Sequence, residues 1–201
     1  MNSAVLSSAT ETLIVGVDEA GRGAIAGPVT AAACVLPKLK KYPVEIGDSK
    51  QMSPQSRSDS YEWLIQHCLY GVSSVDAATI DKIGIMASDE LAMQQAVKQI
   101  SVRHSDLYLL VDGRDAFWFD HPHSSIIRGD SLELCIGAAS IIAKVTRDRF
   151  MVEQAHEFPQ YGFDGHKGYG APEHQECIRK HGFCVLHRQT FCKGLSLVNS
   201  L

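Results

Sequence analysis

Residues 13–23 of the chain read LIVGVDEAGRG, an apolar run that leads directly into two carboxylates and a glycine-rich turn. Leu13–Val17 is rich in β-branched residues, which predicts a short strand that ends where the charges begin. Side chains alternate between the two faces of a strand, so Asp18 and Glu19 converge only if the pleat breaks there. Gly21 and Gly23 permit such a break, because glycine adopts backbone angles closed to other residues.

The rest of the chain alternates between strand-like and helix-like segments. Short apolar runs predict further strands at Val29–Leu36, Tyr70–Val75 and Leu107–Val111. Helical spacing and end signals predict helices at Pro54–Cys68 with Ser53 as N-cap, at Ser88–Ile100, at Cys135–Phe158 and from Pro172 to Gly182. Interleaved strands and helices indicate the α/β class. No repeat, low-complexity tract or long linker appears, so we expect one domain over residues 1–201.

Composition supports a compact globular chain: of 201 residues, 45% are hydrophobic and 21% are charged, enough for a sizeable core. Met1–Thr12 has no basic residue ahead of an apolar stretch, unlike a secretory signal. Gly27 and Pro28 interrupt the apolar run Ile25–Pro37, which is too short to span a bilayer. We therefore expect a soluble cytoplasmic protein with no membrane partner.

The six cysteines include no C-x-x-C pair, which favours reduced thiols in a cytosolic protein. Zinc is an alternative for the C-terminal stretch, where six histidines and cysteines gather. Their spacing fits no common structural zinc pattern. They are His174, Cys177, His181, Cys184, His187 and Cys192.

The net charge of −4 does not exclude a nucleic-acid partner. Of the 23 acidic residues, four in a metal site would leave 19 to balance the 19 lysines and arginines. Basic residues that could follow a phosphate backbone fall mostly in the C-terminal third, and Lys50 is a further candidate near the site. The C-terminal set is Lys144, Arg147, Lys167, Arg179, Lys180, Arg188 and Lys193.

Two more aspartates complete a candidate cluster of carboxylates. Asp112 follows the predicted strand Leu107–Val111, and Asp130 lies in a predicted turn before the long helix. Together with Asp18 and Glu19 they supply oxygen ligands of the kind that hard divalent cations require, so Mg²⁺ or Mn²⁺ suits the set better than zinc. Asp148, one helix away, is an alternative that could also approach the site, but it is expected to be a surface or ion-pairing residue beside Arg147 and Arg149.

A dinucleotide-binding loop is a rival interpretation of the glycines at 21, 23 and 27, which resemble a loosened G-x-G-x-x-G. Asp18 and Glu19 would place two negative charges beside a pyrophosphate. Pro28 and a strand-like run follow, rather than a helix that offers its N-terminal amides. We therefore expect no nucleotide cofactor.

Ordered motifs along the chain resemble the type 2 ribonucleases H. The resemblance opens with GVDEAGRG at residues 16–23 and GPV at 27–29, and covers roughly Leu13–Phe191. The later motifs are DSK at 48–50, VDG at 111–113, GDS at 129–131, AASIIAKVTRD at 138–148 and HKGYG at 166–170. Ala171 departs from the pattern, because a threonine is common after this motif.

The resemblance implies a ribonuclease H-like fold, a mixed sheet flanked by helices with a helical C-terminal part at about 172–201. It also implies that Asp18, Glu19, Asp112 and Asp130 are catalytic, the first three as metal ligands. The expected reaction cleaves the RNA strand of RNA–DNA hybrids and nicks DNA 5′ of embedded ribonucleotides. Two metal ions would support hydrolysis to a 5′-phosphate and a 3′-hydroxyl.

Substrate recognition is expected from the turn Gly21-Arg22-Gly23 and from Tyr169. The backbone of the turn can approach a ribose closely enough to detect its 2′-hydroxyl, so Gly21→Ala is expected to impair cleavage without unfolding the protein. The resemblance implies that Tyr169 lies against the sugar on the DNA side of a ribo-to-deoxy junction. We expect a monomer whose partners are RNA–DNA hybrids and ribonucleotide-containing DNA.

Three other functions differ in what they require. A type 3 ribonuclease H carries an additional N-terminal substrate-binding domain, whereas only twelve residues precede the first predicted strand here. A non-catalytic nucleic-acid-binding module would not require four carboxylates at the motif positions, and its binding would persist in EDTA without cleavage. A nicotinamide-dependent oxidoreductase would bind its cofactor saturably.

Overall fold

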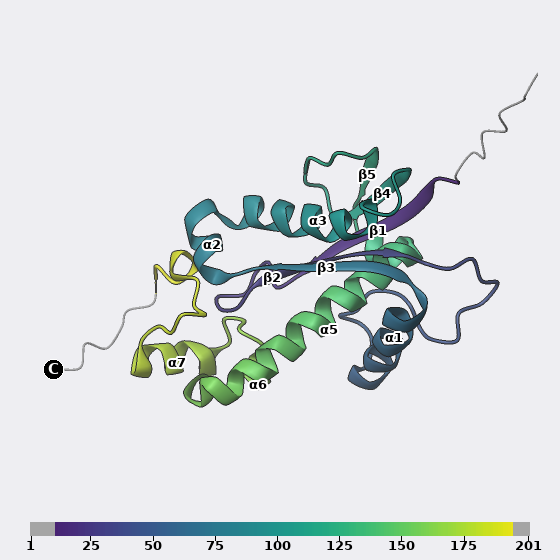
Figure 1. Cartoon of the computed structure of the whole chain (residues 1–201). Helices are drawn as coiled ribbons and strands as arrows, with labels where there is room; N and C mark the ends of the chain where they lie inside the picture. The colour runs from purple at the N-terminus through teal and green to yellow at the C-terminus, as the bar shows by residue number, and fades with distance from the viewer. Residues whose placement is uncertain (1–10, 195–201) are drawn as a thin grey trace, which may run out of the picture.

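The computed structural model of the chain describes residues 11–194 and is built around a five-stranded sheet (Figure 1). The strand order is β3-β2-β1-β4-β5. The central strand β1 (Leu13–Ala20) pairs antiparallel with β2 (Val29–Val35) and parallel with β4 (Leu107–Asp112). The edges are β3 (Leu69–Val75), antiparallel to β2, and β5 (His123–Ile126), parallel to β4. The expected mixed sheet is confirmed.

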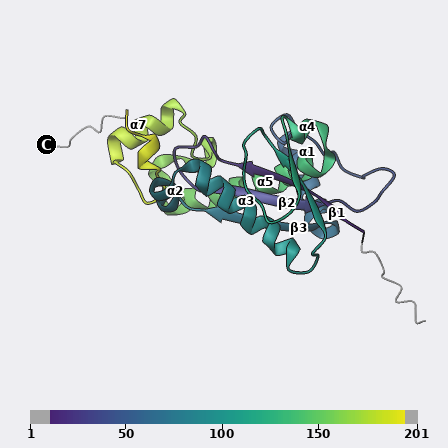
Figure 2. The ribbon, with the colours of Figure 1, turned by 90° about the horizontal axis from the view of Figure 1, so that it is seen from above.

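Helices cover both faces of this sheet. Helix α3 (Ile85–Ser101) packs on β2 and β3 from one side, preceded by the short α2 (Ala77–Ile83). Helix α5 (Leu134–Glu157) packs on β1 and β2 from the other side, where α1 (Pro54–His67) contacts it. Figure 1 shows the sheet nearly edge-on between these layers, and Figure 2 shows α3 in front of the strands with α5 behind them.

Strand β2 is buried on both faces, which explains its uninterrupted run of small apolar residues. Ala31 and Ala33 belong to the core under α3, whereas Ala32 and Cys34 belong to the core under α5. On β1, a Cβ at Gly16 would lie 2.0 Å from the backbone carbonyl carbon of Cys135. The start of α5 therefore lies against β1 at a position where only glycine fits.

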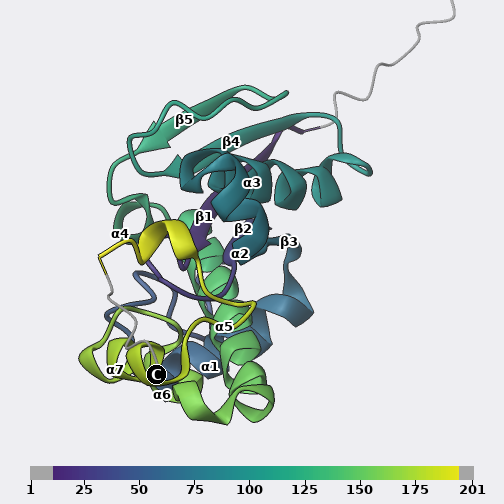
Figure 3. The ribbon, with the colours of Figure 1, turned by 90° about the vertical axis from the view of Figure 1, so that its left-hand side faces the viewer.

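The C-terminal part of the chain packs against the far end of α5 (Figure 3). It contains α6 (Phe163–His166) and α7 (Pro172–His181), with 3-10 turns at Pro159–Tyr161 and Gln189–Phe191. A small core there includes Ala26, Met151, Tyr161 and Phe163, so it joins this part to the segment that follows β1. The expected helical C-terminal part is present, and residues 195–201 of its expected range lie outside the described residues.

The predicted end of the first strand at Val17 is wrong. Strand β1 continues to Ala20, because Asp18 and Glu19 pair with Ala32 and Ala31 of β2. The ladder therefore runs straight through the two carboxylates, and the expected break in the pleat is absent at this point.

Other expected elements are present with small shifts at their ends. Ser53 caps α1 as predicted, its hydroxyl accepting from the Ser56 amide at 3.1 Å, and Gly182 ends α7 with a φ of 76°. The structure adds α2, β5, α6 and α4 (Gly129–Leu132), which the sequence patterns did not predict. Within residues 11–194, no helix is long and apolar enough to cross a membrane.

Candidate active site

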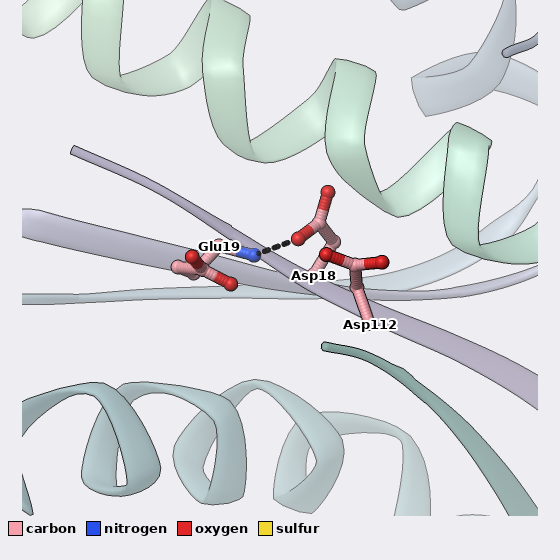
Figure 4. Close-up of side chains that lie close together, drawn as sticks. All are labelled: Asp18, Glu19 and Asp112. Carbon is pink, nitrogen blue, oxygen red and sulfur yellow. Dashed lines mark hydrogen bonds between the residues drawn. The ribbon is translucent and has the colours of Figure 1, made fainter. Parts of the chain in front are cut away.

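Three carboxylates converge at one end of the central strands (Figure 4). Asp18 and Glu19 lie near the end of β1, and Asp112 is the last residue of β4. Because β1 and β4 are parallel neighbours, their carboxyl ends meet at the same edge of the sheet. Each residue offers one oxygen, and these oxygens lie within 4.8 Å of one another. No other group of this kind occurs within residues 11–194.

Asp18 and Glu19 converge although the strand is regular. Figure 4 shows Asp18 pointing toward α5 and Glu19 pointing away from it. Asp18 is buried, and its Oδ1 accepts a hydrogen bond of 2.7 Å from the Glu19 amide. The alternation of side chains is thus preserved, and the two carboxylates reach a common space at the strand end.

Asp130 adjoins this group without being part of it. It is buried in the short helix α4 rather than in the predicted turn, and Arg128 before it has the left-handed φ of 58°. The Gly129 amide donates to Asp112 Oδ1 at 2.7 Å, which ties α4 to the end of β4. Asp148, in contrast, pairs with Lys144 at 2.9 Å rather than with its arginine neighbours.

Burial and mutual repulsion raise the pKa values of Asp18, Glu19 and Asp130. Burial raises the pKa of Asp18 well above its ordinary range, and the charges of Glu19 and Asp112 add to this. Burial likewise raises the pKa of Glu19 and of Asp130. Burial opposes the charge of Lys50, but nearby carboxylates outweigh it and raise its pKa. The site therefore has an excess of negative charge that favours cations.

The turn Gly21-Arg22-Gly23 follows β1 directly. Gly21 has a φ of 91°, and a Cβ there would lie 1.9 Å from Nε of the buried Arg147. Gly23 has no heavy atom within 4 Å of where its Cβ would be. The expectation that Gly21→Ala leaves the fold intact is therefore not supported, because the new methyl group would collide with the interior. Gly23 is the position open toward solvent.

Two fully buried arginines donate hydrogen bonds to the backbone around this turn. Arg147 donates to the carbonyl oxygens of Pro28, Lys167 and Ala26 at 2.8, 2.9 and 3.1 Å. Arg188 donates to the carbonyl oxygens of Gly27 and Arg22 at 2.9 and 3.1 Å. Both had been candidates for contacts with phosphates. The sequence left open which basic residues contact the duplex, and in the structure these two guanidinium groups donate to backbone carbonyls inside the protein.

The side chain of Arg22 points to three acidic residues. Its Nη2 lies 2.5 Å from Asp115, its Nε 3.5 Å from Asp89 and its Nη1 3.9 Å from Glu19. Asp89 is fully buried on α3, and burial raises its pKa to about 8. Asp89 and Asp115 were not predicted as site residues, because an acidic residue on a helix or in a loop carries no signal in the sequence that it faces this site.

A cleft of about 450 Å³ joins the predicted recognition residues to Glu19, one of the clustered carboxylates. Tyr169 lies at its rim, partly exposed, with its ring centre 5.6 Å from Lys144 Nζ. The structure thus brings Tyr169, Glu19, the glycine turn and Lys50 to one cavity, although they are far apart in sequence. The lining residues are Glu19, Ala20, Gly21, Arg22, Gly23, Ser49, Lys50, Lys144 and Tyr169.

Known proteins match the chain over most of its length. The family model described as Ribonuclease HII matches residues 15–194. A ribonuclease HII of Syntrophus aciditrophicus (strain SB) is 45% identical over 180 residues, which cover 89% of this chain and 84% of that protein. The chain belongs to the ribonuclease HII family. It is therefore an enzyme of the ribonuclease H type 2 class.

Solved structures agree with this membership of the ribonuclease HII family. The ribonuclease H2 of Pyrococcus horikoshii OT3 matches with a TM-score of 0.70 and 25% identity, covering 88% of this chain and 92% of that one. Bst-RNase HIII, solved in complex with Mn²⁺, matches with a TM-score of 0.69 but only 16% identity, and 64% of its length is covered. The type 3 protein thus shares the fold, whereas the sequence relatives are of type 2.

The oxygen ligands that this chain offers fit a hard divalent cation. Asp18, Glu19 and Asp112 offer only oxygen atoms, and burial together with the charges of Glu19 and Asp112 raises the pKa of Asp18. Carboxylate oxygens suit Mg²⁺ or Mn²⁺, whereas structural zinc sites use cysteine and histidine. The predicted divalent-metal requirement is thus consistent with the residues present.

The C-terminal histidines and cysteines do not form the alternative zinc site. His174 Nε2 lies 3.1 Å from His187 Nε2, and His187 Nδ1 accepts from the Cys184 amide at 2.9 Å. The ring nitrogens of these two residues form hydrogen bonds with protein atoms and are not arranged around a common metal position. None of these residues belongs to a potential ligand group in the described part of the chain.

The same histidines predict a loss of stability in acid. Burial lowers the pKa values of His174 and His187 from 6.5 to about 4. Between these pH values the unfolded chain therefore binds protons at both histidines that the folded protein does not bind. The free energy of unfolding should therefore fall as pH decreases from 6.5 toward 4, by no more than about 3 kcal/mol per histidine. Urea unfolding of the wild type and His187→Gln at about pH 7 and about pH 5 tests this. Equal losses in both proteins would contradict it.

Proposed function

We propose that the chain is an endonuclease that cleaves the RNA strand of RNA–DNA hybrids and nicks DNA 5′ of embedded ribonucleotides. The products would carry a 5′-phosphate and a 3′-hydroxyl. The observation that carries this proposal is the cleft in which Glu19 meets the Gly21–Gly23 turn and Tyr169. It places a group able to bind metal beside two elements able to recognise a sugar.

The proposed metal ligands are Asp18, Glu19 and Asp112, with Asp130 as an adjoining catalytic carboxylate. Two divalent ions, Mn²⁺ or Mg²⁺, would neutralise the phosphate, activate a water and stabilise the leaving oxygen. The chain itself holds the ligands in place through the regular β1–β4 pairing and through the Gly129 amide on Asp112. Lys50, surrounded by carboxylates, limits their repulsion and can bind a phosphate oxygen.

Discrimination between RNA and DNA is proposed for the backbone of the glycine turn. The 2′-hydroxyl is the group that separates the two at a given sugar. Arg22 directs its side chain toward Asp115 and Asp89, so its main chain rather than its guanidinium is available to a ribose. The open space above Gly23 permits a sugar to approach closely. We also propose that the protein acts as a monomer in the cytoplasm.

Tyr169→Ala tests the recognition of a ribo-to-deoxy junction. We expect kcat/KM on a duplex with a single ribonucleotide to fall roughly tenfold or more, because stacking on an aromatic ring contributes about 1–3 kcal/mol. Tyr169→Phe keeps the ring and should retain activity. The measurement is cleavage of labelled duplexes, with a long RNA–DNA hybrid as the second substrate and EDTA as the metal-free control.

The two substrates separate the parts of the proposal. A Tyr169→Ala enzyme that nicks the single-ribonucleotide duplex at the wild-type rate would contradict the junction role. Duplex binding that persists in EDTA, without cleavage in any divalent metal, would instead support a non-catalytic binding module.

A further inference from the structure

A chain of hydrogen bonds between two buried histidines ends on the backbone of Tyr169. The Cys184 amide donates to His187 Nδ1 at 2.9 Å, and His187 Nε2 lies 3.1 Å from His174 Nε2. His174 Nδ1 then lies 2.8 Å from the Tyr169 carbonyl oxygen. Both rings are nearly inaccessible to solvent, at 0% exposure for His174 and 3% for His187.

The partners leave one consistent assignment of hydrogens. The Tyr169 carbonyl only accepts, so His174 Nδ1 must carry a hydrogen; the Cys184 amide donates, so His187 Nδ1 must lack one. Neutral His187 therefore carries its hydrogen on Nε2 and donates to His174 Nε2, which is free to accept. Both lowered pKa values agree with two neutral rings. Each group in this series then donates to the next, from the Cys184 amide through His187 and His174 to the Tyr169 carbonyl.

A third histidine, His166, supports the same loop. His166 Nδ1 accepts from the Gly168 amide at 3.1 Å, and its ring stacks on His174 with centroids 4.2 Å apart. The Gly168 carbonyl accepts from the amides of Ile25 and Ala26 at 2.9 and 3.0 Å. The backbone on both sides of Tyr169 is thus fixed, while its ring remains partly exposed in the cleft.

The residue after His187 holds the opposite side of the cleft. The Arg188 side chain donates to the Arg22 carbonyl, and its amide donates to the Ile25 carbonyl at 2.8 Å. His187 itself forms a bridge with Ala26. Two adjacent residues are therefore connected to the two recognition elements. Arg188 donates to the glycine turn, and His187 is linked to Tyr169 through His174.

We propose that His174 and His187 are positioning residues that fix Tyr169 at a set distance from the glycine turn, to which Arg188 ties the same segment. This inference rests on the proposed role of Tyr169 in junction recognition. The histidines touch neither substrate nor metal ligands; they act through the backbone of the loop. Their contribution lies in pre-organising the cleft before the duplex binds.

The test compares His187→Leu, which removes the donor to His174, with His187→Gln, whose side-chain amide can replace it. On the single-ribonucleotide duplex, His187→Leu should lower kcat/KM roughly tenfold, the effect of losing one buried hydrogen bond, and His187→Gln should recover most of it. The double variant His187→Leu with Tyr169→Ala should be no worse than Tyr169→Ala alone. His156→Leu, an exposed histidine at the end of α5, is the matched control.

Hydrogen exchange gives a readout that does not depend on activity. We expect amides at residues 166–171 to exchange at least about tenfold faster in His187→Leu than in wild type, with wild-type rates in His187→Gln and His156→Leu. Unchanged exchange, or activity losses that multiply in the double variant, would overturn the positioning role. Another outcome is faster exchange in His187→Leu while Tyr169→Ala is fully active. That result would support the positioning role of the histidines and refute the junction role of Tyr169.

Discussion

Asp18→Asn is expected to lower the cleavage rate by roughly a thousandfold or more, the largest effect among the variants discussed. The substitution keeps the size of the side chain but removes the charge at the most buried of the three clustered carboxylates. Losing one preorganised charged group from an active site typically reduces kcat by about 10²–10³, and a lost metal ligand adds to this. Single-turnover cleavage of a labelled RNA–DNA hybrid measures the effect.

The fold should survive this substitution. Burial and the neighbouring carboxylates oppose ionisation of Asp18, so the amide removes a repulsion and the metal-free protein should melt no lower than the wild type. Calorimetric titration with Mn²⁺ should show weakened binding. Asp120→Asn, at an exposed loop position, is the control and should bind Mn²⁺ normally. Normal metal affinity in Asp18→Asn would remove Asp18 from the proposed ligand set.

Gly23→Ala is expected to lower kcat/KM by about a hundredfold while the protein remains folded. A Cβ at this position meets no protein atom within 4 Å, so the methyl group projects into the space that the sugar would enter. Displacing a substrate by about 1 Å is enough for a loss of this size. The comparison of wild type and variant on the single-ribonucleotide duplex, with thermal melting of both, tests the prediction.

Gly21→Ala is expected, in contrast, to destabilise the folded protein. Its Cβ would overlap Arg147, and its φ of 91° is unfavourable for any side chain, so we expect a loss of about 2–4 kcal/mol in the free energy of unfolding. Full cleavage by a stable Gly23→Ala enzyme would show that the sugar does not approach the turn from the open side.

The sequence predicted the parts of this structure that depend on local patterns. Apolar runs indicated the central strands, and the Ser53 cap indicated the start of α1. The end of β1 was misplaced, because charged residues usually end a strand, whereas here pairing with Ala31 and Ala32 carries the strand through them. Strand β5 escaped prediction because it has four residues, of which only one is apolar.

The sequence predicted the carboxylates of the candidate site but not the buried arginines that hold the surrounding backbone. Motif resemblance indicated Asp18, Glu19 and Asp112, and the structure brings all three together. The inward orientation of Arg147 and Arg188 was not predictable, because an arginine in sequence gives no indication of whether its partners are phosphates or buried carbonyls. Such assignments depend on tertiary contacts between residues more than 100 positions apart.

The most direct test of the proposed function maps the products from a DNA duplex that carries one ribonucleotide. The labelled duplex is incubated with Mg²⁺, Mn²⁺ or EDTA, and the position and chemical ends of the nick are determined. The account predicts a single nick 5′ of the ribonucleotide, leaving a 5′-phosphate and a 3′-hydroxyl, only when a divalent metal is present. A nick that persists in EDTA, or one that leaves a 3′-phosphate, would contradict the carboxylate and metal chemistry proposed for this site.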